Sequence, residues 1–235
     1  SMPLAAHAQW RGDRLWLRLE DRFEFAGYET RSRYEYDYHL HDLTLELERQ
    51  YGILSTVRVG GGAGWRTVPD SSVIDYDRWV AAAAWDAEWG AHLTVLETRF
   101  ERRSYADAGV RSPYSDGLGR LAAQIALHPR VRLRPEYRTS ILRYDLQDSV
   151  YTDASEHSIE LLVEGDPSGR TVLALGPRLE MRRVASDVDR PYNQWGLKGS
   201  VSFAMGGSLF LQFTDEVGKR WYDAGDETFY SDLVF

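Results

Sequence analysis

The sequence contains no cysteine, and this absence excludes both a disulfide framework and any metal site built on thiolates. It also lacks a long hydrophobic run. The longest uninterrupted one spans residues 79–85, which is far shorter than the roughly 18 residues that a transmembrane helix needs. A helical membrane protein is therefore excluded.

An excess of positive charge is missing as well. The chain carries 28 Lys and Arg residues against 36 Asp and Glu residues, for a formal net charge of −8. Phosphate binding needs a basic surface, and neither a basic cluster nor a zinc-finger spacing is present, so a general role with nucleic acid is excluded. No Pro/Gly/Ser-rich linker divides the chain, which indicates a single domain.

What the chain does have is a strict alternation of apolar and charged residues. Residues 15–25 read LWLRLEDRFEF, with Leu and Phe on one parity, charged residues on the other, and Asp21 as the exception. This period of two predicts an extended strand with two unlike faces. The charges alternate in sign, as they do where neighbours must neutralise each other at close quarters. The pattern favours a barrel with apolar side chains toward lipid and a polar lumen.

The alternation continues along the chain and predicts about twelve strands. We place them at 14–26, 29–40, 43–59, 74–88, 92–103, 118–128, 130–145, 157–164, 171–183, 193–205, 208–216 and 227–235.

Turn signals and polar stretches separate these strands in a regular rhythm. Short turn signals recur at Gly90, Pro129, Pro167 and Gly206, and longer polar stretches lie between them, at 104–116, 147–156, 185–193 and 217–227. Short turns at one end and long loops at the other are typical of outer-membrane barrels. The prediction is an all-β, antiparallel up-and-down transmembrane β-barrel with short periplasmic turns and longer outer loops.

Some segments leave alternatives open. Residues 79–91 and 117–127 also have helical propensity or helical spacing of apolar residues, so an α+β domain remains possible, as does a soluble secreted β-rich protein. Arg49 falls on the apolar parity, which requires a bulge or an early end of its strand.

The N-terminus has the character of a processed end. Ser1-Met2 reads as a cloning scar, and Ala6-His7-Ala8 is similar to the small-x-small site at which a signal peptide is cut. We therefore expect residues 1–8 to be a scar and signal-peptide remnant, and residues 9–235 to form one β-barrel domain.

The chain ends Phe229-Tyr230-Ser231-Asp232-Leu233-Val234-Phe235. A terminal Phe with apolar residues two and six positions earlier resembles the C-terminal strand of Gram-negative outer-membrane β-barrels, although Ser231 and the short segment depart from its fullest form. The resemblance implies an outer-membrane location in a Gram-negative bacterium. It also implies contact with outer-membrane lipid and recognition by the barrel-assembly machinery through the strand that ends at Phe235. It implies no activity.

The sharpest chemical feature is a set of basic residues on the polar parity. Guanidinium groups pair with carboxylate or phosphate, so in a lumen they would favour anions. The prediction is a passive channel for small hydrophilic, preferentially anionic, solutes. The expected channel-lining residues are Arg18, Arg22, Arg33, Arg130, Arg132, Arg134, Arg138, Arg178, Arg182, Glu20, Glu24 and Glu35.

The same residues support a second hypothesis. If each Arg pairs with a lumen carboxylate, the charges fill the barrel, and the protein is a non-conducting scaffold or a partner subunit in an envelope complex. A twelve-stranded barrel lies between small filled barrels and wide porins, so strand number does not decide between the two.

Other chemistry has weak support. His39 and His41 with Asp37 lack a third cluster at metal-ligand spacing, and His157-Ser158 has no nucleophile-elbow motif. The glycines of 60–64 are not followed by Lys-Ser or Lys-Thr, so they are not a phosphate loop. We expect no metal, no cofactor and no enzymatic activity.

Overall fold

The computed structural model describes residues 2–27, 37–52, 54–69, 72–147, 150–185, 191–205, 209–222 and 225–230. The described chain is almost entirely β-strand, with one short 3-10 helix, η1 (Ser72–Ile74). None of its helices is long and apolar enough to cross a membrane. The strands are β1 (Met2–Arg11), β2 (Leu15–Ala26), β3 (Tyr38–Tyr51), β4 (Ser55–Thr67), β5 (Tyr76–Trp89), β6 (His92–Tyr105), β7 (Tyr114–His128), β8 (Val131–Tyr144), β9 (Ala154–Gly165), β10 (Thr171–Val184), β11 (Tyr192–Met205), β12 (Leu209–Tyr222) and β13 (Gly225–Tyr230).

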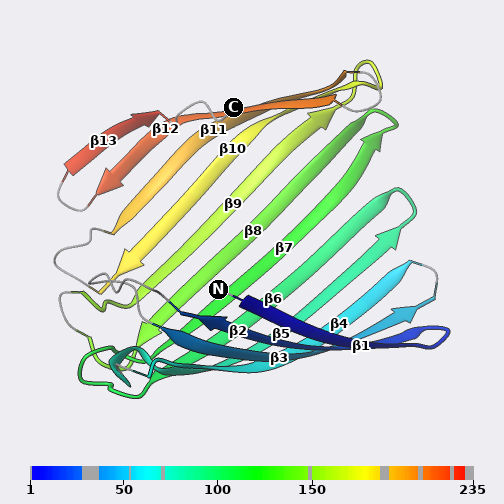
Figure 1. The fold of residues 1–235 in the computed structure, drawn as a ribbon. Coiled ribbons are helices and arrows are strands. Elements are labelled where there is room, and N and C mark those ends of the chain that lie inside the picture. The colour runs from blue at the N-terminus through cyan, green and yellow to red at the C-terminus, as the bar shows by residue number, and fades with distance from the viewer. Residues whose placement is uncertain are drawn as a thin grey trace. The chain divides into compact units, whose positions relative to one another are not determined.

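These thirteen strands form one sheet in which each strand pairs with its neighbours in sequence (Figure 1). The pairs from β1 to β4 and from β9 to β13 are antiparallel. Up to β12, short segments between strands alternate with long ones, and the turns expected at Gly90, Pro129 and Pro167 fall in short ones. The turn expected at Gly206 lies outside the described residues. The prediction of an all-β, antiparallel up-and-down sheet is confirmed.

The chain divides into two compact units. The first comprises residues 1–85, 97–118 and 141–153, and the second comprises residues 86–96, 119–140 and 154–235. The first therefore holds β1 to β4, and the second holds β9 to β13, while β5 to β8 each contribute to both.

Strands in both units have two unlike faces, and the apolar face is the more exposed. In β10, Leu175 is 55% exposed and Leu179 53%, whereas Ala174 and Glu180 on the opposite face are 7% and 8% exposed. A strand of a soluble protein has the reverse order. No large side chain of the described residues is fully buried, so the apolar side chains have no protein core. We call the two surfaces the apolar face, with Leu17, Leu45, Leu161, Leu175 and Leu197, and the polar face, with the intervening residues.

The structure corrects several predicted strand boundaries. The expected break between the strands 29–40 and 43–59 is wrong, because β3 runs through His41 and Asp42 without interruption; residues 29–36 lie outside the described residues. The expected strand 43–59 is itself divided, because β3 ends at Tyr51 and the chain turns at Gly52, where φ is 66°. Arg49 stays on the apolar parity, and its guanidinium carbon lies 4.8 Å from the ring centroid of Tyr51. The polar stretch 217–227 is not one loop, because β12 continues to Tyr222 and pairs with β11.

A further correction concerns the N-terminus. Residues 2–8, which we expected to precede the β-domain, lie in β1 and pair with β2 in the register Ala6↔Asp21 and Ala8↔Leu19. The alternation in this segment is hard to detect because alanines occupy both faces.

The two ambiguous segments are strands. Residues 79–91 fall mainly in β5 and residues 117–127 fall in β7, so the α+β alternative is wrong. The helical propensity of alanine is a weak preference, and pairing within a sheet overrides it.

Gly176 lies on β10 directly against the backbone of β9. The paired residues of these two strands skip Gly176 and Pro177, and proline has no N–H to donate to a neighbouring strand. A Cβ atom built at Gly176 would overlap the backbone of Leu161 and Leu162. Backbone atoms cannot move aside as a flexible side chain can, so only glycine fits here.

This close approach predicts different effects for two glycines of the sheet. Gly176→Ala should lower the free energy of unfolding by about 1 to 3 kcal/mol, the usual cost of overpacking. Gly199→Ala is the control, because its Cβ would meet Leu175 Cδ1 at 3.5 Å, an ordinary contact. Urea unfolding of the two refolded variants measures the difference. Equal stability of both would contradict the assigned approach of β10 to β9.

Candidate functional site

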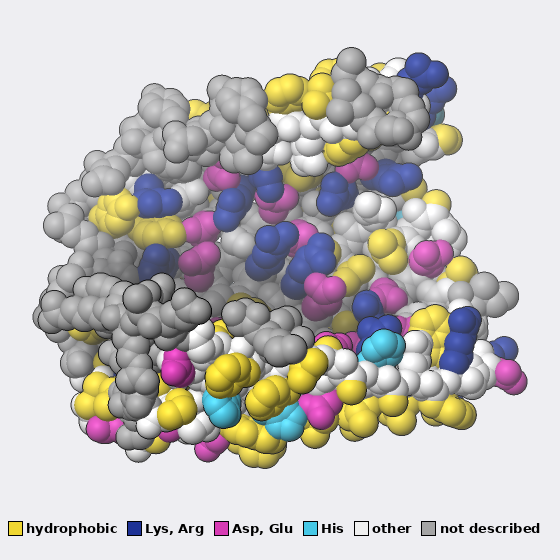
Figure 2. Space-filling model, in the orientation of Figure 1, with side chains coloured by type: hydrophobic (Ala, Val, Ile, Leu, Met, Phe, Trp, Pro, Cys, Tyr) yellow, Lys and Arg dark blue, Asp and Glu magenta, His cyan; other side chains and the backbone are white. Residues whose placement is uncertain are grey.

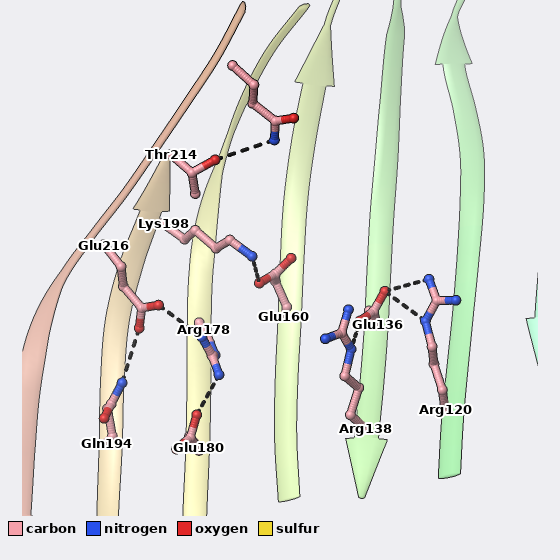
Figure 3. A network of polar contacts seen from close by, with 11 residues as sticks. Arg120, Glu136, Arg138, Glu160, Arg178, Glu180, Gln194, Lys198, Thr214 and Glu216 are labelled. Carbon is pink, nitrogen blue, oxygen red and sulfur yellow. Dashed lines mark hydrogen bonds and ion pairs between the residues drawn. The ribbon is translucent and has the colours of Figure 1, made fainter. Parts of the chain in front are cut away.

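The polar face of the second unit carries a connected network of charged side chains (Figure 3). Arg178 lies at its centre: Nη2 donates to Glu180 Oε2 at 2.5 Å and Nη1 to Glu216 Oε2 at 3.0 Å. Gln194 Nε2 donates to Glu216 Oε1 at 3.1 Å, and Arg220 Nη2 donates to Gln194 Oε1 at 2.6 Å. The network thus links β10, β11 and β12 through hydrogen bonds between side chains.

The centre of this network is shielded from solvent. Glu180, Gln194 and Glu216 are 8%, 6% and 9% exposed. Tyr192 closes one side, because its hydroxyl donates to Glu180 Oε1 at 2.5 Å and its ring lies 4.2 Å from the guanidinium carbon of Arg220. Buried carboxylates are tolerated when they are paired with a cation and hydrogen-bonded. The carboxylates of Glu180 and Glu216 meet both conditions.

A second contact spans three strands. Lys198 on β11 is paired in register with Gly176 on β10, yet its Nζ reaches Glu160 Oε2 on β9 at 2.7 Å. Gly176 itself places no side chain between the two charges. Glycine at this position therefore allows both the backbone approach and the ion pair.

Further ion pairs join the neighbouring strands of the same unit. Glu136 accepts from Arg120 Nη2 at 3.0 Å and also pairs with Arg138. Glu164 accepts from Arg134 Nη1 at 2.7 Å, while Arg132 Nη1 lies 4.0 Å away. One carboxylate therefore serves two guanidinium groups at each of these points.

The first unit has the same chemistry on its polar face. Arg78 donates to Asp42 at 2.8 Å, and Arg99 and Arg103 each donate to Glu101 at 2.8 Å. In Figure 2, basic and acidic side chains are interspersed over the face in view and are not separated into patches. Mixed charges of this kind give a weak net field.

Most of the sequence-predicted site arginines lie on the polar face and have acidic partners. Arg18 lies 3.9 Å from Glu46, and Arg22 donates to Glu24 at 2.8 Å. Arg130 is different, because Nη1 donates to the carbonyl of Pro167 at 3.2 Å and no described carboxylate pairs with it. Glu20 on β2 and Arg182 on β10 have the expected parity, whereas Arg33 and Glu35 lie outside the described residues. Lining of a channel by these residues stays a prediction.

Sequence reasoning missed several members of the network. Arg120 lay in a segment with helical spacing, and Arg220 lay in a stretch expected to be a loop. The signal that could have found them is parity, since all of them lie on the polar face. The missed residues are Arg120, Glu160, Gln194, Lys198, Glu216 and Arg220.

Two of the histidines that the sequence singles out have different surroundings. His41 pairs with Asp21, and its ring lies 4.3 Å from that of Trp65. His157 contacts the hydroxyl of Tyr137 at 2.9 Å, whereas Ser158, the next residue along the strand, belongs to the opposite face. Among the described residues, no group of three His, Cys, Asp or Glu side chains could hold a metal ion.

One ion pair lies just beyond the C-terminal end of β8. Arg102 donates from both terminal nitrogens to the carboxylate of Asp145, at 2.7 and 2.5 Å. These charge-assisted hydrogen bonds lower the pKa of Asp145 below its usual range. The pair fixes the start of the segment 145–153 against β6.

No protein-family model and no curated protein sequence matches the chain. Two solved structures are similar in fold. The beta domain of the Bordetella autotransporter Brka has a TM-score of 0.34 and 15% identity, over 89% of this chain and 93% of that one. OmpT, an outer membrane protein of Vibrio cholerae, has a TM-score of 0.48 and 9% identity, over 99% of this chain and 84% of that one.

The difference in burial between two arginines predicts a difference in their contribution to stability. Arg178→Leu should lower the free energy of unfolding by about 3 to 5 kcal/mol, because it leaves the Glu180 and Glu216 carboxylates buried without their cation. Arg18→Leu should cost less than about 1 kcal/mol, because the side chains of Arg18 and Glu46 are about half exposed and their N–O distance is long. Chemical unfolding measures both, and similar costs would contradict the network.

Proposed function

We propose that the chain is an outer-membrane β-barrel whose apolar face contacts lipid and whose polar face lines a passage for small hydrophilic solutes. One observation carries the proposal: large apolar side chains are exposed along one face of the sheet, while charged side chains are buried on the other. Water would penalise this arrangement, whereas a bilayer around the apolar face favours it.

The connectivity supports a membrane location in a second way. Inside a bilayer every backbone N–H and C=O must be paired within the protein, because lipid offers no partner. A sheet in which each strand pairs with its neighbours in sequence meets this requirement along its interior strands. Strands of 12 and 14 residues, such as β2 and β10, are long enough to cross a bilayer.

We infer that the passage is passive and only weakly selective. The carboxylates beside Arg134, Arg138 and Arg178 offset most of the positive charge. An anion preference would therefore come from Arg130, which has no described carboxylate partner, and from Arg132, whose distance to Glu164 is 4.0 Å.

A second candidate is a non-conducting scaffold or partner subunit in an envelope complex. The buried network around Arg178 favours it, because side chains that are hydrogen-bonded on every side occupy space and bind no solute. The cavity among Arg120, Arg134, Glu136 and Glu160 has a volume of only about 70 Å³, enough for a few water molecules.

The lipid contact predicts a difference between two neighbouring positions of β3. Leu45→Arg should cost about 2 to 4 kcal/mol of stability in lipid vesicles, because it places a charge on the lipid-facing side near the middle of the strand. Thr44→Arg is the control, since it projects from the polar face between Asp42 and Glu46. Equal tolerance of the two would argue against the membrane proposal.

The passage predicts a change of ion preference in planar bilayers. Glu164→Gln removes the carboxylate that Arg132 and Arg134 share, so the preference for anions should rise. The double variant Arg132→Glu with Arg134→Glu should reverse the preference while conductance persists. Reversal potentials in a salt gradient measure both. A wild-type protein that inserts without resolvable conductance would reject the passage and favour the scaffold.

A further inference from the structure

The apolar face of the second unit is hollowed by a groove of about 440 Å³ that crosses β9, β10, β11 and β12. Its apolar lining comes from five side chains, Ile159, Leu179, Met181, Trp195 and Trp221. Two indoles form one wall of the groove. The ring centroids of Trp195 and Trp221 are 6.5 Å apart, with an angle of 29° between the planes.

Positive charge lies at one edge of this groove. Arg183 follows Met181 by two residues on the same face of β10, next to the end of the strand at Val184. Its Nη2 donates to Asn193 Oδ1 at 3.0 Å, and its Nη1 lies 3.1 and 3.4 Å from the carbonyls of Arg182 and Tyr192. These acceptors are neutral, and no described carboxylate pairs with Arg183. The side chain is exposed, so its charge is not offset as that of Arg178 is.

A second cation lies beside the indole wall. Lys219 Nζ is 5.4 Å from the ring centroid of Trp221, and Lys219 shares the apolar parity of β12 with Trp221. Asn193, which holds Arg183, also lines the groove. The groove therefore has an apolar body along Leu179 and a cationic edge near the end of the strands.

We propose that this groove binds an anionic phospholipid, with an acyl chain along Ile159, Leu179 and Met181 and the phosphate at Arg183 and Lys219. The inference rests on the proposed membrane location and adds a specific lipid site to it. Charge complementarity decides the occupant: an acyl chain matches the apolar lining, and a phosphate accepts charge-assisted hydrogen bonds from guanidinium and ammonium groups. The two indoles suit the level of lipid headgroups, where one edge is apolar and the other is wet.

A neighbouring groove provides an internal comparison. It has a volume of about 620 Å³ and lies around Gly199, lined by Leu175, Leu197 and Phe213. Each groove has one acid and no Lys or Arg in its lining, Asp215 here and Glu180 in the first groove. The two grooves differ in what lies beside them, because Arg183 at the end of β10 and Lys219 next to Trp221 flank the first groove. We therefore assign the preference for an anionic lipid to Arg183 and Lys219 and not to groove size.

The test uses the full chain refolded in bilayer nanodiscs that contain equal amounts of phosphatidylglycerol and phosphatidylcholine. Native mass spectrometry after release from the nanodisc measures which lipid stays bound. We expect retained phosphatidylglycerol in excess, and the double variant Arg183→Gln with Lys219→Gln should reduce that excess about tenfold. Arg183→Lys should keep it, whereas Trp195→Ala should weaken retention of both lipids.

Two control measurements separate the outcomes. Gln substitution of Arg182, which lies on the polar face, should leave lipid retention unchanged. Resistance to urea in lipid vesicles reports insertion independently of lipid retention. A chain that inserts but retains both lipids equally, or is insensitive to the Arg183 and Lys219 changes, overturns the lipid site and leaves the membrane proposal standing. A chain that does not insert overturns both.

Discussion

Pairing between consecutive strands is the interaction on which the rest of this structure depends. The sheet is a single layer, and none of its described large side chains is fully buried. Backbone hydrogen bonds and cross-strand contacts therefore take the place that a hydrophobic core has in a soluble domain. Each strand from β2 to β12 is held by the two strands next to it in sequence, so the contacts that build the fold come mostly from nearby parts of the chain.

The polar face shows how charge can be buried in such a sheet. Glu180 and Glu216 flank one guanidinium group, and Gln194 and Tyr192 satisfy the remaining carboxylate oxygens. Desolvation of a carboxylate costs several kcal/mol, and pairing offsets it only when the geometry is good. These contacts join strands that are already paired, so their contribution is to fix side chains on one face more than to bring strands together.

Much of the fold follows from the sequence because a period of two is insensitive to the details of turns. The parity rule places Leu173 and Leu175 on one face and Arg178 and Glu180 on the other, as observed. It fails where side chains are too small to mark a face, as in β1, and where one glycine turns the chain, as at Gly52.

Which residues pair within the ion-pair network does not follow from the alternation. Parity shows that Arg178 and Glu216 lie on the same face, but they pair only because β10, β11 and β12 have one particular register. That register depends on turn geometry, which alternation does not encode. The row Arg130 to Arg138 can be recognised from the sequence because its members are close together along the chain. The pairing of its arginines with Glu164 on the next strand cannot, because it depends on the register.

The bridge from Lys198 to Glu160 over Gly176 has a consequence for how the sheet assembles. An ion pair between adjacent strands reports the alignment of two strands, but this one reports three, because β10 lies between the charges. A slip of β10 by one residue would place Pro177 under the lysine, and a slip by two would place the Arg178 side chain there. The ion pair therefore favours one alignment of β9, β10 and β11 over the shifted ones. It can do so because the residue between the two charges is glycine.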